Sequence, residues 1–365
     1  MKNKENYFID FLRFIFSLCI ISYHSWIFAG TFGNGFFNYG YLAVDFYFIV
    51  TGYLMMNSIF KNKNNNKVVL KESFHFIYKK ITRLFPSLFV TFIIGIFFVY
   101  GKEVFINPRL LLSNQLLPEL LQLGIFGYDM TINSSWWYIS AMLFALALLY
   151  PIALRYKEDY SKYIAPIILV IFLGIVNIFK VNINDPFLIQ LFLRNGFYKA
   201  VIFIILGNIS FMITKKIKEK EFKKIEVMIL SIMEVLLYII LIINMNYFYI
   251  GTFVFALLLM LNISLTFSSI TISTKIFKNP IWKELGNYGF YMYLCNISIR
   301  TYLLNKYSTM CLPYKEMFIK LEVTTMIVGL ISYIIVELIY KKMIQKSIVN
   351  NKNKKSHMIE IGLNT

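Results

Sequence analysis

Ten apolar segments, each long enough to cross a hydrocarbon core of about 30 Å, restrict the fold of this chain more than any other feature. Every backbone N–H and C=O in a bilayer core needs an internal partner, so such segments predict α-helices. With 58% hydrophobic and 15% charged residues, the chain has too much apolar surface for a soluble protein. We therefore predict an all-α polytopic membrane protein with about ten transmembrane helices. The segments cover residues 7–28, 39–60, 82–101, 135–154, 163–179, 187–213, 225–243, 248–272, 285–304 and 316–340.

Lysine and arginine are distributed unevenly between the loops that join these segments. If the N-terminus is cytoplasmic, the inner loops and both ends hold 27 of them and the outer loops hold five. Basic residues concentrate on the cytoplasmic side of membrane proteins, so this pattern predicts that both termini lie in the cytoplasm. The Lys-, Asn- and Ile-rich composition suggests an AT-rich bacterial genome, and we expect the protein in the bacterial plasma membrane. No nucleic-acid-reading motif accompanies the net charge of +18, so we expect no nucleic-acid partner.

Three segments outside the predicted spans have their own interpretation. Residues 104–127 are fairly apolar but interrupted by polar residues, and a span there would invert the charge pattern downstream, so we expect an outer loop with an interfacial or re-entrant helix. Residues 61–67 are predicted to be a solvated inner linker. We assign residues 1–340 to one membrane domain and residues 341–365 to a polar cytoplasmic tail that is expected to be disordered.

Arg13 and His24 both lie inside the first apolar segment. At about 100° per residue their spacing places both side chains on one face of a helix, about 16 Å apart along its axis. Ionisable side chains within a membrane helix are costly and are candidates for function by default.

His24 has a candidate partner in the second segment, which a short loop joins to the first. Asp45 is expected at a similar depth near the outer leaflet. A carboxylate on one imidazole nitrogen fixes the tautomer and raises the basicity of the ring, as a general base for a hydroxyl requires. The alternative is a His–Asp pair that only locks two helices together.

A second group of basic residues lies at the inner end of the third segment. Together with Arg13, Lys80 and Arg83 would form a cationic pocket that faces the cytoplasm and suits a phosphorylated ligand. Basic residues at inner helix ends are also routine interfacial anchors. This alternative is stronger for Lys80 and Arg83 than for Arg13, which lies deeper.

Further candidates fall in the outer half of the predicted bundle. Acceptor or pocket candidates there are Trp137, Tyr138, Ser140 and Arg194. Aromatic residues at this depth are also typical of an interfacial belt. The sequence has no Gly-rich phosphate loop, no G-x-S-x-G elbow and no His/Cys cluster, so we expect no metal site.

Several motifs, taken in order along the chain, resemble the acyltransferase-3 family of membrane-bound acyltransferases. Arg13 and His24 reproduce its R-x10-H pattern, and Asp45 stands at its aspartate. Lys80 replaces the usual first arginine of its R-x-x-R stretch, and Asn296 stands where many members carry a histidine. The similar segments are FLRFIFSLCIISYH (11–24), GYLAVDFYFIVTGYLM (40–55), KKITRLFP (79–86), WWYISAMLFALALLYP (136–151) and LGNYGFYMYL (285–294).

The resemblance implies an O-acyltransferase, with acetyl as the favoured group. The donor would be cytoplasmic acyl-CoA, a co-substrate rather than a tightly bound cofactor. The acceptor would be a hydroxyl of an extracytoplasmic glycan, such as capsule or exopolysaccharide, or of a lipid-linked sugar. His24, oriented by Asp45, would deprotonate that hydroxyl, or would carry the acyl group transiently. Arg13, Lys80 and Arg83 would bind the donor.

Two other functional classes remain open at this point. The first is a non-enzymatic transporter or flippase for a lipid-linked sugar, with buried charged residues lining its pathway. No internal repeat of the kind common in transporters is visible in the sequence. The second is a membrane-embedded sensor or assembly partner, which only the absence of a soluble catalytic domain favours.

The charge pattern gives a direct test of topology. In a background without native cysteines, Lys63→Cys and Asn114→Cys should react with an impermeant thiol reagent from opposite sides of the membrane, with position 63 inside. Labelling of both positions from the same side would contradict the ten-helix arrangement.

Overall fold

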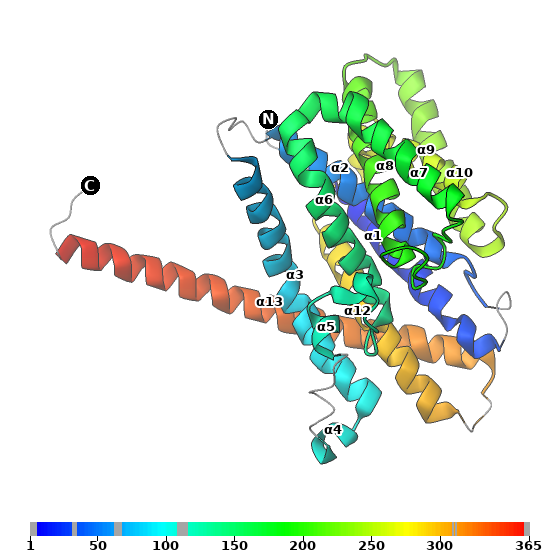
Figure 1. The fold of residues 1–365 in the computed structure, drawn as a ribbon, viewed down its shortest axis with the longest axis vertical. Coiled ribbons are helices and arrows are strands. Elements are labelled where there is room, and N and C mark those ends of the chain that lie inside the picture. Colours follow the sequence, from blue (N-terminus) through cyan, green and yellow to red (C-terminus); the bar gives the residue numbers. More distant parts are fainter. Residues whose placement is uncertain are drawn as a thin grey trace.

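The computed structural model describes residues 6–30, 35–61, 68–107, 116–308, 310 and 312–360. In these described residues every assigned element is a helix, and one isolated β-bridge is also present. Ten long helices coincide with the ten apolar segments and pack into one bundle (Figure 1). They are α1 (Tyr7–His24), α2 (Ala43–Lys61), α3 (Val69–Tyr100), α6 (Trp137–Asp159), α7 (Ala165–Ile178), α8 (Asn195–Lys218), α9 (Lys224–Tyr247), α10 (Thr252–Ser268), α12 (Ile281–Tyr307) and α13 (Tyr314–Glu360).

Seven helical stretches of the described residues are long and apolar enough to cross a membrane. One stretch, Ser134–Ile178, joins α6 and α7 through a π-helical turn at Tyr160–Ile164. A positive φ of 42° at Lys157 breaks the helix there, and α7 turns back to pack on α8 (Figure 1). Among the ten long helices, α10 is too short to count as one of these seven stretches, and α12 is not one of them either. The exact number of membrane crossings therefore stays a prediction.

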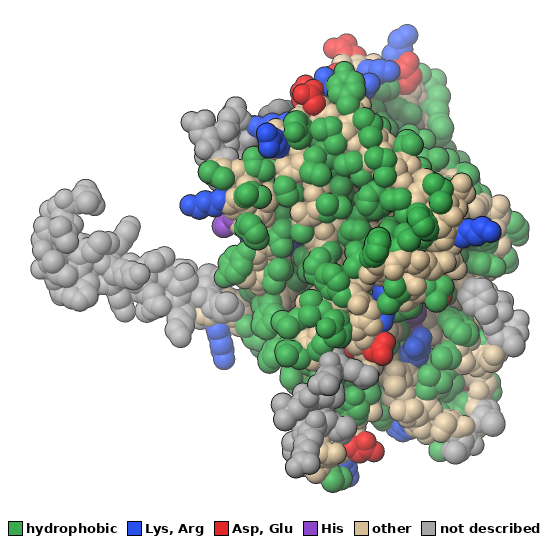
Figure 2. All heavy atoms as spheres, viewed as in Figure 1, with side chains coloured by type: hydrophobic (Ala, Val, Ile, Leu, Met, Phe, Trp, Pro, Cys, Tyr) green, Lys and Arg blue, Asp and Glu red, His purple; other side chains and the backbone are tan. Residues whose placement is uncertain are grey.

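The surface of the bundle is consistent with contact with lipid. Figure 2 shows hydrophobic side chains covering the middle of the visible face, while charged side chains gather at its upper end. Lipid-facing positions of α9 such as Ile232, Leu236 and Ile240 are about half exposed. In water such a surface would be costly, but in a bilayer it is solvated by acyl chains.

Two glycines bring α2 and α8 into close contact. A Cβ added at Gly52 would overlap the carbonyl oxygen of Ile204, and a Cβ added at Gly207 would overlap that of Ile49. Small residues let membrane helices approach closely enough for backbones to touch. The Asp45–Lys199 pair lies nearer the starts of both helices than this crossing does, so α2 and α8 run parallel.

Close packing also joins α1 to α12, again in parallel. Gly286 lies against Asp10 near the start of both helices, where an added Cβ would come within 2.6 Å of the Asp10 carbonyl oxygen. His24 contacts Asn296 farther along. The first and ninth segments therefore run in one direction, as do the second and sixth, and both pairings fit the alternation that the charge pattern predicts.

The interrupted segment between α3 and α6 forms short helices in its described part, not a span. These are α4 (Glu103–Ile106), α5 (Leu116–Leu120) and a 3-10 turn (Leu123–Phe126), while residues 108–115 lie outside the described residues. The buried Glu119 carboxylate accepts backbone N–H bonds from Thr131, Ile132 and Asn133 at 2.6–3.0 Å. Burial raises the pKa of this carboxyl and the three donors oppose that shift. Glu119 thus fixes the chain that leads into α6.

The C-terminal tail differs from expectation. Residues 341–360, predicted to be disordered, continue α13 as helix, and this part leads away from the bundle (Figure 1). Extending an existing helix costs little because no new nucleus is needed, and Lys, Met and Gln are good helix formers. The predicted linker is described only at Lys61, and its residues 62–67 lie outside the described residues.

The glycine contact between α2 and α8 predicts the effect of adding one methyl group. Gly52→Ala and Gly207→Ala should each lower stability by about 1–3 kcal/mol, because neither backbone can yield without moving its helix. Thermal unfolding of detergent-purified protein measures this. Gly174→Ala is the matched control, since a Cβ there meets no atom within 4 Å. Equal unfolding temperatures for Gly52→Ala and Gly174→Ala would contradict the packing.

Candidate functional site

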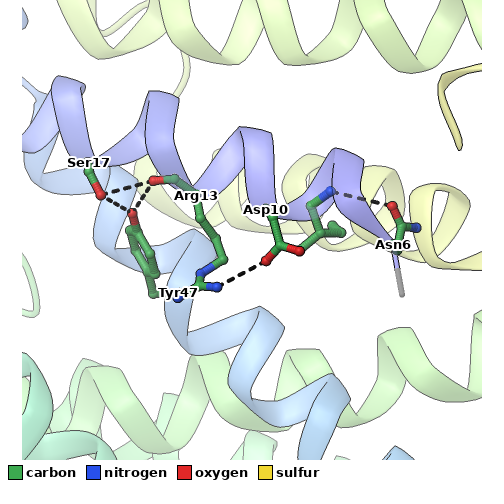
Figure 3. Close-up of polar contacts among 6 residues, drawn as sticks. Asn6, Asp10, Arg13, Ser17 and Tyr47 are labelled. Carbon is green, nitrogen blue, oxygen red and sulfur yellow. Dashed lines mark hydrogen bonds and ion pairs between the residues drawn. The ribbon is translucent and has the colours of Figure 1, made fainter. Parts of the chain in front are cut away.

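Arg13 lies in a small polar cluster formed by α1 and α2. Its Nη1 atom pairs with Asp10 Oδ1 at 3.0 Å, one turn earlier on the same helix. Its carbonyl oxygen accepts from the hydroxyls of Tyr47, at 2.5 Å, and Ser17, at 3.0 Å. Figure 3 shows these groups on one side of α1, with Tyr47 reaching across from α2. The Arg13 side chain is 28% exposed, so its guanidinium remains accessible to an anion.

The structure brings Arg13 into no described contact with Lys80 or Arg83. These two residues lie on α3, which packs on α12, α6 and α13. Lys80 Nζ lies 5.5 Å from the centre of the Phe76 ring, and the carbonyl oxygen of Arg83 accepts from the Tyr340 hydroxyl at 2.6 Å. A joint cationic pocket of Arg13, Lys80 and Arg83 therefore stays a proposal. It would require a bound donor that reaches from Arg13 to the other two residues.

The imidazole of His24 is bound by Asn296 of α12. His24 Nδ1 lies 2.6 Å from Asn296 Oδ1, while the Asn296 amide nitrogen donates to the carbonyl oxygen of Tyr293. That second bond fixes the amide orientation, so its oxygen faces the ring and can only accept. His24 Nδ1 must then carry the proton, which leaves the lone pair on Nε2.

Asp45 does not orient His24, contrary to the prediction. Its carboxylate pairs with Lys199 of α8 at 2.8 Å, and both side chains are almost completely buried, at 0% and 2% exposed. Lys199 Nζ also lies 5.5 Å from the centres of the Tyr41 and Phe203 rings. Asp45 pairs with Lys199 because a buried carboxylate is stabilised by a full opposite charge, which a neutral imidazole cannot supply.

Sequence reasoning missed both true partners. Lys199 lies within the sixth apolar segment, and a lysine there requires an acid at the same depth, which Asp45 supplies. In the sequence Asn296 stands out only as a departure from the family histidine. An amide oxygen can orient an imidazole as a carboxylate does, without adding a charge.

Three tyrosines lie between the Arg13 and His24 ends of α1. Tyr47 binds the Arg13 carbonyl, and its ring lies 6.0 Å from that of Tyr138. Tyr138 lies 6.3 Å from Tyr293, edge to face, and the carbonyl of Tyr293 accepts from Asn296. The polar groups of Arg13 and His24 are thus linked through side chains of three helices, α2, α6 and α12.

The remaining outer candidates have mainly structural contacts. Ser140 donates to the carbonyl oxygen of Gln122 at 2.5 Å and accepts from Ile125 N at 3.1 Å, which ties the outer loop to α6. Arg194 binds the Gly127 carbonyl and Asp129, at 3.1 and 3.3 Å. The Trp137 ring packs 6.1 Å from Phe48 and against Gly196. None of these described contacts reaches His24.

A separate polar contact joins α1 to α13. Glu322 of α13 accepts from the Ser22 hydroxyl at 2.8 Å. It lines a mostly apolar cavity of about 370 Å³, together with Leu18, Phe37 and Met326. This cavity is separate from the contact between His24 and Asn296, because its α1 residues include Ile15, Leu18, Cys19 and Ser22 but not His24.

The Asp45–Lys199 pair predicts a non-additive effect on stability. Asp45→Asn or Lys199→Met alone should cost about 3–5 kcal/mol, because each leaves one buried charge without a partner. The double variant should regain most of this loss. Thermal unfolding of the three purified variants measures the coupling, and losses that simply add would contradict a direct pair.

The comparison with known proteins identifies the family of the chain. No curated protein and no solved structure matches the chain. A family model described as an acyltransferase domain matches residues 6–340, which include all ten long helices up to Tyr340 of α13. The chain therefore belongs to the acyltransferase-3 family.

Proposed function

We propose that the protein is a membrane O-acyltransferase, with acetyl as the favoured group. It would move that group from cytoplasmic acyl-CoA to a hydroxyl of an extracytoplasmic glycan or lipid-linked sugar. Family membership supports acyl transfer in general. The observation that carries the proposal is the His24–Asn296 contact, because it leaves the lone pair of Nε2 available as a base within the helix bundle.

The reaction is a direct transfer in which His24 moves one proton. Nε2 accepts the proton of the acceptor hydroxyl as its oxygen attacks the thioester carbon. The new C–O bond forms, the C–S bond breaks, and the proton passes from Nε2 to the departing CoA thiolate. Asn296 keeps the protonated Nδ1 in place and stabilises the imidazolium that forms between these events. Transient acylation of Nε2 is the two-step variant.

Arg13 and His24 would act at different ends of the substrate. About 16 Å separate them along α1, so one residue can bind the phosphates of the donor while the other acts at the thioester. The side chains between them include the hydroxyls of Ser17, Tyr47 and Tyr138, which could bind the polar amides of an extended pantetheine arm. Lys80 and Arg83 would join at the phosphates only once the donor is bound.

The test is transfer of label from radiolabelled acetyl-CoA to surface glycan in membrane vesicles. Wild-type protein should transfer label, and His24→Ala should lower the rate by at least about 100-fold, as expected for loss of a general base. Asn296→Ala should lower it about tenfold or more, because the imidazole loses its fixed tautomer.

The matched control is His75→Ala, since His75 lies exposed on α3 and should leave the rate unchanged. Circular dichroism and size-exclusion profiles establish that each variant is folded. Full transfer by a folded His24→Ala protein would refute the catalytic assignment. Movement of a lipid-linked sugar across the membrane without acyl transfer would favour the flippase alternative.

A further inference from the structure

Arg300 is a cation inside the bundle that no described carboxylate neutralises. It lies on α12, about half-buried, and its Nε atom is fully buried without a hydrogen-bond partner. Three other basic side chains of the bundle each have an acid within ion-pair distance. These pairs are Arg13–Asp10, Arg194–Asp129 and Lys199–Asp45.

The position of Arg300 relates it to the candidate base. It lies one helical turn beyond Asn296 on the same face of α12, or about 6 Å farther along the axis. Asn296 contacts the His24 ring, and α1 and α12 run parallel, so Arg300 lies beyond the ring toward the ends of both helices. Arg300 is therefore a close neighbour of the imidazole on its predicted outer side.

An unpaired guanidinium at this depth is costly. Removing a cation from water without an opposite charge is unfavourable, and ionisable groups within membrane bundles mark binding sites or pathways. A role in helix packing would not need a charge, since leucine or methionine would fill the same volume. The charge itself therefore requires an explanation.

We propose that Arg300 forms an anion subsite that holds a carboxylate or phosphate group of the acceptor while His24 acts on its hydroxyl. The planar guanidinium presents two parallel donors that match both kinds of oxyanion. Arg13, at the opposite end of α1, is the candidate contact for the donor, so Arg300 is free to select the acceptor. This inference rests on the proposed function, and it restricts the acceptor to glycans or lipid-linked sugars that carry negative charge.

The test uses chemical modification of His24, which requires no acyl transfer. His75→Asn with His357→Asn leaves His24 as the only histidine of the three in the chain. Its carbethoxylation by diethylpyrocarbonate is followed in detergent with glucuronate, inorganic phosphate or glucose present. Glucuronate or phosphate should slow the reaction, and glucose should not.

Arg300→Gln should raise the anion concentration that gives half-protection by about tenfold, as expected for loss of a charged hydrogen-bonding partner. Arg300→Lys should raise it less, because it keeps the charge but loses the fork. Arg155→Gln, at an exposed position on α6, is the matched control. In this variant the anions should protect His24 as they do in the parent. Size-exclusion profiles verify that the variants are folded.

Each outcome has a definite meaning. Protection by glucuronate alone supports a sugar carboxylate as the ligand, and protection by phosphate alone supports a phosphate-linked acceptor. Equal protection of the parent and of Arg300→Gln, or no protection of the parent by either anion, would overturn the subsite. Anion protection without label transfer in the vesicle assay would refute the proposed function and leave the subsite intact.

Discussion

The close packing of α1 against α12 is the contact on which the candidate site depends. Gly286 and Gly289 let the two backbones approach so closely that an added Cβ would come within 2.6 Å of Asp10 O at one position and 3.1 Å of Phe14 Cα at the other. This approach sets the register between the helices, and the register places Asn296 against His24. Arg300 follows one turn later. A base, the group that orients it and a neighbouring cation thus arise from a single helix pair.

A second helix pair carries a different buried polar contact. Asp45 and Lys199 join α2 to α8 about two helical turns before the crossing at Gly52 and Gly207. Both charges are sealed from solvent, so the pair fixes the relative position of two helices and leaves neither group available for proton transfer at His24. The two buried polar pairs thus have different roles. The ion pair stabilises the scaffold, and the neutral His–Asn pair keeps a base with a free lone pair.

The sequence predicted the helices well because lipid leaves the backbone few alternatives. Each of the ten apolar segments overlaps a long helix, and the interrupted segment around Glu119 forms short helices in its described part. The placement of Arg13 and His24 on one helix followed from periodicity alone. The prediction failed for the tail, since polar composition does not show whether an existing helix continues. It also failed for Asp45, because a carboxylate has several possible partners in a bundle of ten helices.

The sequence by itself determined the fold class, the positions of the helices and the residues that are costly in a membrane, because these depend on local composition and helical period. Only the tertiary structure decided which costly residues meet. Partner choice depends on which helices adjoin, in what register and direction, and this is set by contacts such as Gly52–Ile204 and Gly286–Asp10. The partners of Asp45 and His24, which are Lys199 and Asn296, therefore follow only from the positions of α8 and α12 in the bundle.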